Sequence, residues 1–251
     1  MSTQIWKEIA YHAEHGPSIA LATIIDHKGS TPQGVGNKML VRPDGSIVGT
    51  IGGGALEYKI MHMGLQALEK NTNLRSKLNL TYDLGMCCGG IVEVFIEIIH
   101  PLDQLVIYGA GHVGMALANI ARTLDYKVTL IDPRPDFVEP TEGIHFLEAH
   151  PLDVLESLPF GQRCDHFITT HEHTLDQDIL MALSSKHIRY LGMIGSPTKK
   201  KKFHMRFTAG ELDTTVFDRL HTPAGLPIKA QTPAEIAISI AAELIETRRS
   251  S

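Results

Sequence analysis

The sequence has little that would cross-link it, hold it in a membrane or draw it to nucleic acid. Three of its 251 residues are cysteine, Cys87, Cys88 and Cys164, and an odd count with an adjacent pair is not a disulfide framework. Its apolar runs are far shorter than the ~20 residues of a membrane-spanning helix. The net charge is −5 at pH 7, so the chain lacks the basic excess of a nucleic-acid binder.

The rest of the composition is that of an ordinary globular protein. Hydrophobic residues make up 43% and charged residues 20% of the chain, which is enough apolar material for a sizeable core. Residues 1–16 carry charges and no secretory apolar stretch. Thiols without a disulfide pattern are typical of a reducing compartment. We therefore expect a cytoplasmic α/β protein of two modest domains.

Residues 1–100 are predicted to form an N-terminal mixed α+β domain. Apolar residues at helical spacing, such as Leu56, Ile60 and Met63, indicate a helix over 55–70. Pro43-Asp44-Gly45 is a turn signal between two short strands. A proline at position 101 favours a boundary there. The expected elements are helices at 5–15 and 55–70 and strands at 18–25, 38–42, 46–50, 78–82 and 91–99.

Residues 101–251 are predicted to form a Rossmann-like domain with a parallel sheet, because strands and helices alternate. The expected strands are 104–108, 126–131, 144–147, 165–169 and 189–193, and the helices 112–124, 151–158, 174–186 and 198–207. A last helix spans 233–247, with Thr232 as N-cap and Glu235 completing a capping box. The sequence leaves open whether this helix packs in its own domain or back on the first.

A dinucleotide-type fingerprint follows the first strand of the second half. Gly109 permits a tight turn, Gly111 lets the backbone approach a pyrophosphate, and Gly114 lets helix and strand pack closely. His112 lies at the start of the helix, whose free amides attract an anion. Asp132 ends the second strand, where a carboxylate can accept a hydrogen bond from a ribose hydroxyl. Arg134 is either a phosphate ligand or a solvated loop charge.

A second glycine-rich turn, Gly52-Gly53-Gly54, precedes the helix of the first half. Free amides at this helix N-terminus are one candidate anion site. The alternative is a tight strand-to-helix turn in which Glu57 is a capping acid. The residues alone do not choose between the two.

Three further features are open to a functional and to a structural interpretation. His171-Glu172-His173 follows a strand end, where ligands bind in α/β sheets; it is either a metal site together with Asp176 or a polar loop in which Thr174 caps the next helix. The run Lys199 to Lys202, next to Ser196, is either a phosphate or docking patch or a solvated helix face. The Cys87-Cys88 pair, flanked by glycines, is either a pair of small inert hydrophobes or a site in which one thiol faces a ligand.

Several motifs in one order carry a family resemblance that covers almost the whole chain. They are Gly29-Ser30-Thr31-Pro32, Lys38-Met39-Leu40-Val41, Gly49 to Glu57, Cys88-Gly89-Gly90, Tyr108 to Val113, Asp132-Pro133-Arg134-Pro135, Thr170-His171, Gly192 to Ser196, Thr222 to Leu226 and Thr232 to Ala237. With these the chain resembles the XdhC/CoxI family, accessory proteins of molybdenum hydroxylases such as xanthine dehydrogenase. Two mild departures are the extra thiol of Cys87 and Ala224 in place of a small aliphatic residue such as isoleucine.

The resemblance implies a molybdenum cofactor chaperone rather than a turnover enzyme. Such a protein binds the molybdopterin cofactor, protects it, promotes its sulfuration with a cysteine desulfurase and inserts it into a xanthine dehydrogenase-type hydroxylase. We expect a homodimer that binds neither nucleic acid nor membrane. Cys88 is the candidate contact for molybdenum because a thiolate is a soft ligand. The candidate cofactor-binding residues are Cys88, Gly89, Gly52, Gly53, Gly54, Glu57, Gly109, Gly111, His112, Gly114, Asp132, Arg134, His171 and Ser196.

Two other classes of function stay open from the sequence. One is an NAD(P)-dependent oxidoreductase that uses the fingerprint and Asp132, with His171 as its single acid/base candidate. The other is a metal-dependent hydrolase built on His171, His173 and Asp176.

Overall fold

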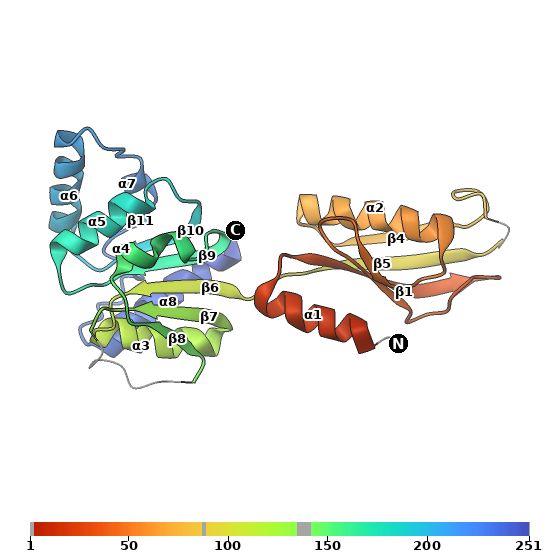
Figure 1. Ribbon diagram of the computed structural model, residues 1–251, viewed down its shortest axis with the longest axis horizontal. Helices are drawn as coiled ribbons and strands as arrows, with labels where there is room; N and C mark the ends of the chain where they lie inside the picture. The colour runs from red at the N-terminus through yellow and green to blue at the C-terminus, as the bar shows by residue number, and fades with distance from the viewer. Residues whose placement is uncertain (1–2, 87–88, 135–141, 251) are drawn as a thin grey trace. The chain divides into compact units, whose positions relative to one another are not determined.

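A computed structural model describes residues 3–86, 89–134 and 142–250, which form two compact units (Figure 1). The units are Met1–Pro101 and Leu102–Ser251. Each has its own sheet and its own hydrophobic core.

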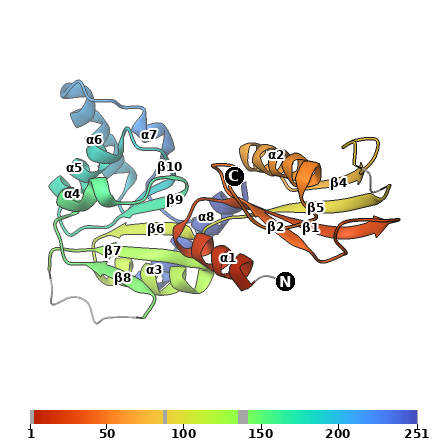
Figure 2. The ribbon, with the colours of Figure 1, turned by 45° about the vertical axis from the view of Figure 1, so that its right-hand side comes forward.

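The first unit is an antiparallel sheet with one helix on each face (Figure 2). The strand order is β3-β2-β1-β5-β4, with every neighbouring pair antiparallel. This confirms the predicted mixed α+β class. Its elements are α1 (Thr3–His15), β1 (Ile19–Lys28), β2 (Lys38–Val41), β3 (Ile47–Gly49), α2 (Gly54–Lys70), β4 (Leu74–Asn79) and β5 (Ile91–Ile99).

Alternation along β1 places two sets of side chains on opposite faces of this sheet. Ala20, Ala22 and Ile24 belong to the core under α2, whereas Ile19 and Leu21 belong to the smaller core under α1. The next residue on the α1 face is Thr23, opposite Lys38 of β2. The α1 face therefore changes from apolar to polar along β1.

The expected strand over 78–82 is wrong in its bounds, because β4 ends at Asn79. The side-chain Oδ1 of Asn79 accepts hydrogen bonds from the amides of Thr81 and Tyr82, both at 3.1 Å. Asp83 Oδ2 accepts a hydrogen bond from the amide of Asn79 at 2.7 Å. These bonds replace the sheet pairing, so the chain turns where apolar content alone favoured a strand.

The second unit contains a six-stranded parallel sheet with the order β11-β10-β9-β6-β7-β8. The strand order reverses between β6 and β9, as in a Rossmann fold, which confirms the predicted fold class. Its elements are β6 (Asp103–Tyr108), α3 (His112–Ala121), η1 (Arg122–Leu124), β7 (Tyr126–Ile131), β8 (Ile144–Leu147), α4 (Pro151–Val154), η3 (Leu155–Ser157), β9 (Gly161–Ile168), α5 (His173–Leu183), β10 (Ile188–Met193), α6 (Pro197–Ala209), α7 (Val216–Arg219), β11 (Leu220–His221) and α8 (Pro233–Ser250).

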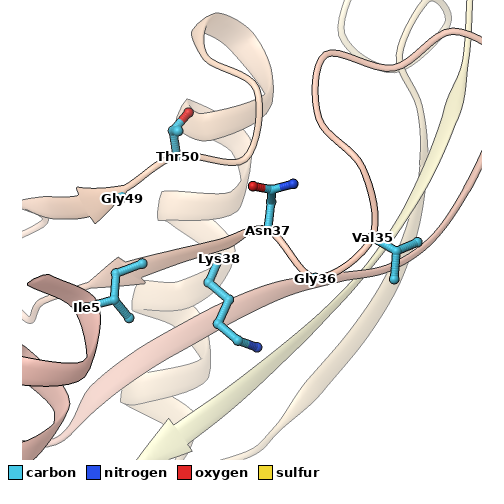
Figure 3. Close-up of a pocket in the computed structure, with 7 residues that line it drawn as sticks. All are labelled: Ile5, Val35, Gly36, Asn37, Lys38, Gly49 and Thr50. Atoms are coloured by element: carbon cyan, nitrogen blue, oxygen red, sulfur yellow. The ribbon is translucent and has the colours of Figure 1, made fainter. Parts of the chain in front are cut away.

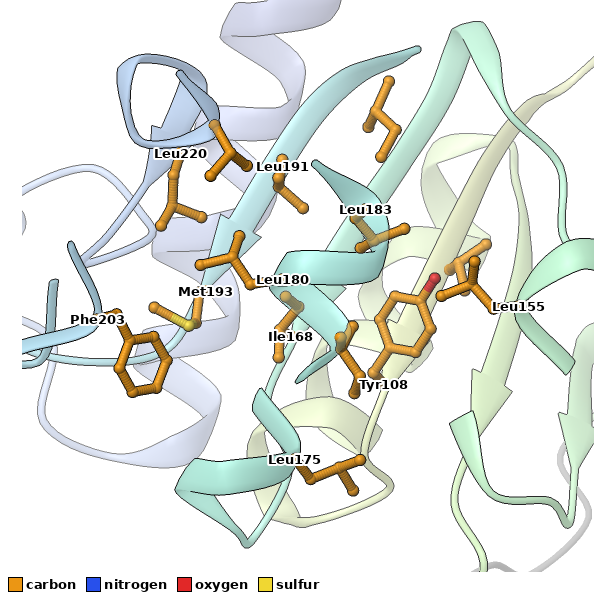
Figure 4. Close-up of a cluster of buried hydrophobic side chains, with 14 of the residues drawn as sticks. Tyr108, Leu155, Ile168, Leu175, Leu180, Leu183, Leu191, Met193, Phe203 and Leu220 are labelled. Atoms are coloured by element: carbon orange, nitrogen blue, oxygen red, sulfur yellow. The ribbon is translucent and has the colours of Figure 1, made fainter. Parts of the chain in front are cut away.

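Helices cover both faces of the parallel sheet. α3 and α8 pack together on one face, over a core that includes Leu117, Ile240 and Leu244. Residues of α4 to α7, among them Leu180 and Phe203, pack in the core of the other face (Figure 4). The apolar side of α8 is thus buried within its own unit. Its capping box forms as expected, with Thr232 and Glu235 exchanging hydrogen bonds at 3.0 and 3.3 Å.

Three elements of this unit depart from expectation. Thr174 is not the N-cap of α5: the cap position is Glu172, and the Thr174 hydroxyl donates to its carboxylate at 2.5 Å. The short α7 and β11 were not anticipated, because four and two residues are too few to show a periodicity. β11 adds the sixth strand beside β10.

His166 of β9 is a buried titratable group with both ring nitrogens hydrogen-bonded. The Tyr108 hydroxyl donates to its Nδ1 at 2.9 Å, and its Nε2 donates to the carbonyl of Pro159 at 3.0 Å. Desolvation by burial lowers the pKa of His166 from 6.5 to about 4. The folded protein therefore holds a neutral imidazole at neutral pH.

This predicts a loss of stability on mild acidification. Below pH 6.5 the unfolded chain takes up a proton at His166 while the folded chain resists it down to about pH 4. The free energy of unfolding should fall across this window by about 3 kcal/mol more in the wild type than in His166→Gln, which does not titrate there. Urea unfolding at pH 7.0, 5.5 and 4.5 checks it, and equal pH dependence in both proteins would contradict it.

Candidate functional site

Three glycine-containing motifs of the first unit lie together in space. Gly90, just before β5, lies so close to Ser30 that a Cβ atom there would clash with the carbonyl oxygen of Ser30. A Cβ atom on Gly52 would lie 2.8 Å from Cβ of Pro32. The 29–37 loop is therefore packed between the segment that ends at Gly90 and the Gly52-Gly53-Gly54 turn. The sequence placed these segments on separate loops and gave no sign that they meet.

Glu57 organises the glycine-rich turn from the first helical turn of α2. Its Oε1 accepts hydrogen bonds from the Thr50 hydroxyl at 2.5 Å, the Gly53 amide at 2.9 Å and the Ile51 amide at 3.3 Å. This is the geometry of a capping acid. An anion at these two amides would have to displace Glu57, whereas Gly54 is exposed beside them.

The cysteine pair, including the candidate Cys88, lies outside the described residues. Its neighbour Gly89 is exposed, and Gly90 is buried against Ser30. Among the other candidate residues, the structure brings Gly52, Gly53 and Glu57 together in the first unit. Gly54 continues the same turn, and the candidates from Gly109 to Ser196 belong to the second unit.

In the second unit, the glycine loop has the close packing that its sequence indicates. A Cβ atom on Gly109, whose φ is 112°, would clash with the Thr169 carbonyl, and one on Gly114 would clash with the Gly109 carbonyl. A Cβ atom on Gly111 would have no atom within 4 Å. Gly111 is thus the glycine of this loop that stands open to a ligand, with His112 exposed beside it.

Asp132 is bound within the protein on both carboxylate oxygens. Oδ1 accepts hydrogen bonds from the Arg134 amide at 3.1 Å and from its Nε at 2.8 Å. Oδ2 accepts from the Ala110 amide and from Nη2 of Arg134, both at 2.8 Å. Burial would raise the pKa of Asp132, but these hydrogen bonds outweigh it and hold the pKa below its ordinary value. The carboxylate is ionised and its acceptor positions are filled.

A buried ion pair, which the sequence did not single out, connects the ends of β9 and β10. Asp176 of α5 is fully buried, and its Oδ2 accepts a hydrogen bond from Nζ of Lys199 at 2.5 Å. Its Oδ1 accepts from the Thr170 hydroxyl and amide at 2.7 and 3.1 Å. Lys199 also donates to the Ile194 carbonyl at 3.1 Å. Burial is the signal that separates Lys199 from the exposed Lys201 and Lys202 of the same run.

This ion pair bears on the candidate metal site of His171, His173 and Asp176. His171 and His173 are exposed, and His173 Nδ1 is 3.8 Å from an Asp176 oxygen that already accepts from Lys199. Within the described ranges no group of three or more His, Cys, Asp or Glu residues could hold a metal ion. Ser196 is the N-cap of α6, and its hydroxyl accepts a hydrogen bond from the Lys199 amide at 3.2 Å.

The fold and these motifs define a two-part protein with a Rossmann unit. Comparison with known protein families identifies the family to which it belongs. Residues 105–244 match the XdhC Rossmann domain, and residues 12–81 match the XdhC and CoxI family. The chain therefore belongs to the XdhC/CoxI family.

Two curated relatives and one solved structure are similar to the chain. It is 35% identical over 256 residues to the uncharacterized protein YqeB of Escherichia coli K12, covering 98% of this chain and 47% of that protein. It is 31% identical over 160 residues to a probable xanthine dehydrogenase subunit of Bacillus subtilis, covering 62% of this chain and 46% of that protein. The chain thus spans about half the length of these relatives.

The solved structure is a crystal structure described as a xanthine dehydrogenase from Bacillus halodurans. It matches with a TM-score of 0.55 at 22% identity, covering 97% of this chain and 95% of that chain. At this identity the likeness concerns the fold. Separately, no helix in the described part of the chain is long and apolar enough to cross a membrane.

The contact of Gly90 with Ser30 predicts different effects at two adjacent glycines. Gly90→Ala should destabilise the first unit by about 1–3 kcal/mol, because the new Cβ atom clashes with backbone. Gly89→Ala is the matched control: its Cβ atom would be 3.9 Å from the Thr81 hydroxyl, so the cost should stay within about 0.5 kcal/mol. Urea unfolding followed by circular dichroism measures both. Equal stability of the two variants would show that the motifs are not packed as described.

Proposed function

We propose that the chain is a molybdenum cofactor-binding maturation factor rather than an enzyme with turnover. In this proposal it binds the molybdopterin cofactor, protects it and promotes its sulfuration together with a cysteine desulfurase. It then inserts the cofactor into a xanthine dehydrogenase-type hydroxylase. Two findings support this direction: membership of the XdhC/CoxI family, and similarity to a protein described as a probable part of a xanthine dehydrogenase.

The observation that carries the proposal is the packing of the family motifs of the first unit. Gly90, the 29–37 loop and the Gly52 turn are far apart in the sequence and lie against one another. Gly89 and Gly90 directly follow the cysteine pair, so the backbone contact with Ser30 restrains the chain beside Cys88. In this proposal the Cys88 thiolate binds the soft metal centre of the cargo, and free backbone amides bind its phosphate group.

The nicotinamide alternative fits the second unit less well. An NAD-type cofactor needs an acidic residue after the second strand to accept hydrogen bonds from the ribose hydroxyls. Asp132 stands at that position, but both of its oxygens already accept hydrogen bonds from Arg134 and the Ala110 amide. Ribose binding there would require Arg134 to leave a buried carboxylate, which is costly. The open backbone at Gly111 remains available to another phosphate-bearing ligand.

The proposal predicts what the protein carries when it is purified from molybdenum-replete cells. Pterin released on denaturation, molybdenum and nucleotide are measured on the same sample. We expect pterin together with molybdenum, and a loss of at least about tenfold in bound molybdenum on Cys88→Ala if the thiolate is a ligand.

Cys164→Ala is the control for this experiment, since Cys164 is a buried thiol in the core of β9 and should leave the cargo unchanged. A pterin-free protein with bound NAD would overturn the proposed function. Full cofactor retention by Cys88→Ala would overturn the role of that thiol alone.

A further inference from the structure

A pocket opens on the α1 face of the first unit, between the 29–37 loop and the turn that leads to Gly52. Its volume is about 460 Å³, within the roughly 300–1,000 Å³ of small-molecule sites. Figure 3 shows its lining side chains, with Ile5 and Val35 on opposite sides and Asn37 facing Thr50. The lining residues are Ile5, Val35, Gly36, Asn37, Lys38, Gly49 and Thr50.

The pocket lies where the sheet continues beyond the apolar core under α1. That core ends with Leu21 and Leu40, and the next cross-strand pair on this face is Thr23 with Lys38. Gly49 keeps this space open with a φ of 87°, because a Cβ atom there would lie 2.6 Å from Cδ1 of Ile5. The pocket therefore exists because β1 and β2 continue past the apolar core and because residue 49 has no side chain.

Lys38 is the one charged residue among those that line the pocket. Its Nζ donates to the Thr23 hydroxyl at 2.7 Å, which leaves two further N–H donors. Within the described part of the chain, no carboxylate oxygen lies within 4.0 Å of it. Arg42 and Arg75 in the same unit differ, since they pair with Glu8 and Glu93 at 2.8 and 2.6 Å. A partly buried ammonium group without an acidic partner attracts an anion.

We propose that this pocket holds the phosphate end of the cargo, with the Lys38 ammonium group bound to the phosphate and Ile5 and Val35 against the pterin. The inference rests on the proposed function and adds a location and a residue to it. Thr50 lies in the pocket wall and begins the turn that Glu57 organises, so the pocket adjoins the packed family motifs.

The test compares cofactor binding to the full-length wild type, Lys38→Met and Lys38→Arg under anaerobic conditions. Lys38→Met keeps most of the apolar stem and removes the charge, and should weaken binding roughly tenfold or more. Lys38→Arg should restore most of the affinity. Lys70→Met, at the exposed end of α2, is the control for loss of one positive charge in the same unit and should bind as the wild type does.

Two more arms identify the group that Lys38 binds. Phosphatase-treated cofactor should bind the wild type and Lys38→Met equally, because the interacting group is missing from the ligand. Inorganic phosphate should compete with the cofactor on the wild type and not on Lys38→Met. A Lys38→Met effect that persists without the phosphate would overturn the assignment.

The failure of this inference is distinct from failure of the proposed function. If the wild type binds the cofactor and Lys38→Met binds it as tightly, the pocket assignment is wrong and the proposed function stands. If the wild type does not bind the cofactor at all, both are wrong. Circular dichroism of each variant confirms that a loss of binding is not a loss of fold.

Discussion

Both units depend on backbone segments that approach too closely for any side chain to fit between them. In the first unit Gly90 lies against the Ser30 carbonyl, and in the second Gly114 lies against the Gly109 carbonyl. Only glycine permits these contacts, so close backbone packing holds the loops that carry the family motifs, together with the hydrogen bonds of Glu57 and Asp132. Loops fixed in this way place amides and neighbouring residues at reproducible positions, as a binding site requires.

The two units use charge differently. At the carboxyl edge of the Rossmann sheet, the buried acids are matched within the protein: Asp132 by Arg134, and Asp176 by Lys199. Such pairs fix the ends of the strands and leave the backbone at Gly111 as the open feature of that edge. In the first unit, Lys38 lines a pocket and has no acidic partner among the residues that the structure describes. This pocket-lining charge lies in the unit that also carries the cysteine pair.

Much of the fold could be predicted from the sequence, because helical spacing at Leu56 and Ile60 and the glycine fingerprint before α3 are local patterns. The bounds of β4 could not, since Asn79 and Asp83 side chains end it. The site was also harder to predict, because side-chain bonds formed in the folded protein decide its arrangement. Four consecutive lysines look alike until the structure pairs Lys199 with the buried Asp176, and the pairing of Asp132 with Arg134 fills a position that the fingerprint assigns to a ribose.

The contact of Gly90 with Ser30 was also beyond the sequence, because it joins loops that are far apart along the chain. It is nevertheless the contact on which the account of function depends.

The most direct test is to mix the cofactor-loaded protein with an apo-hydroxylase of the xanthine dehydrogenase type and follow the hydroxylase activity. The account predicts activation that needs the loaded chain and exceeds that from free cofactor at equal concentration. Equal activation by free cofactor would contradict it.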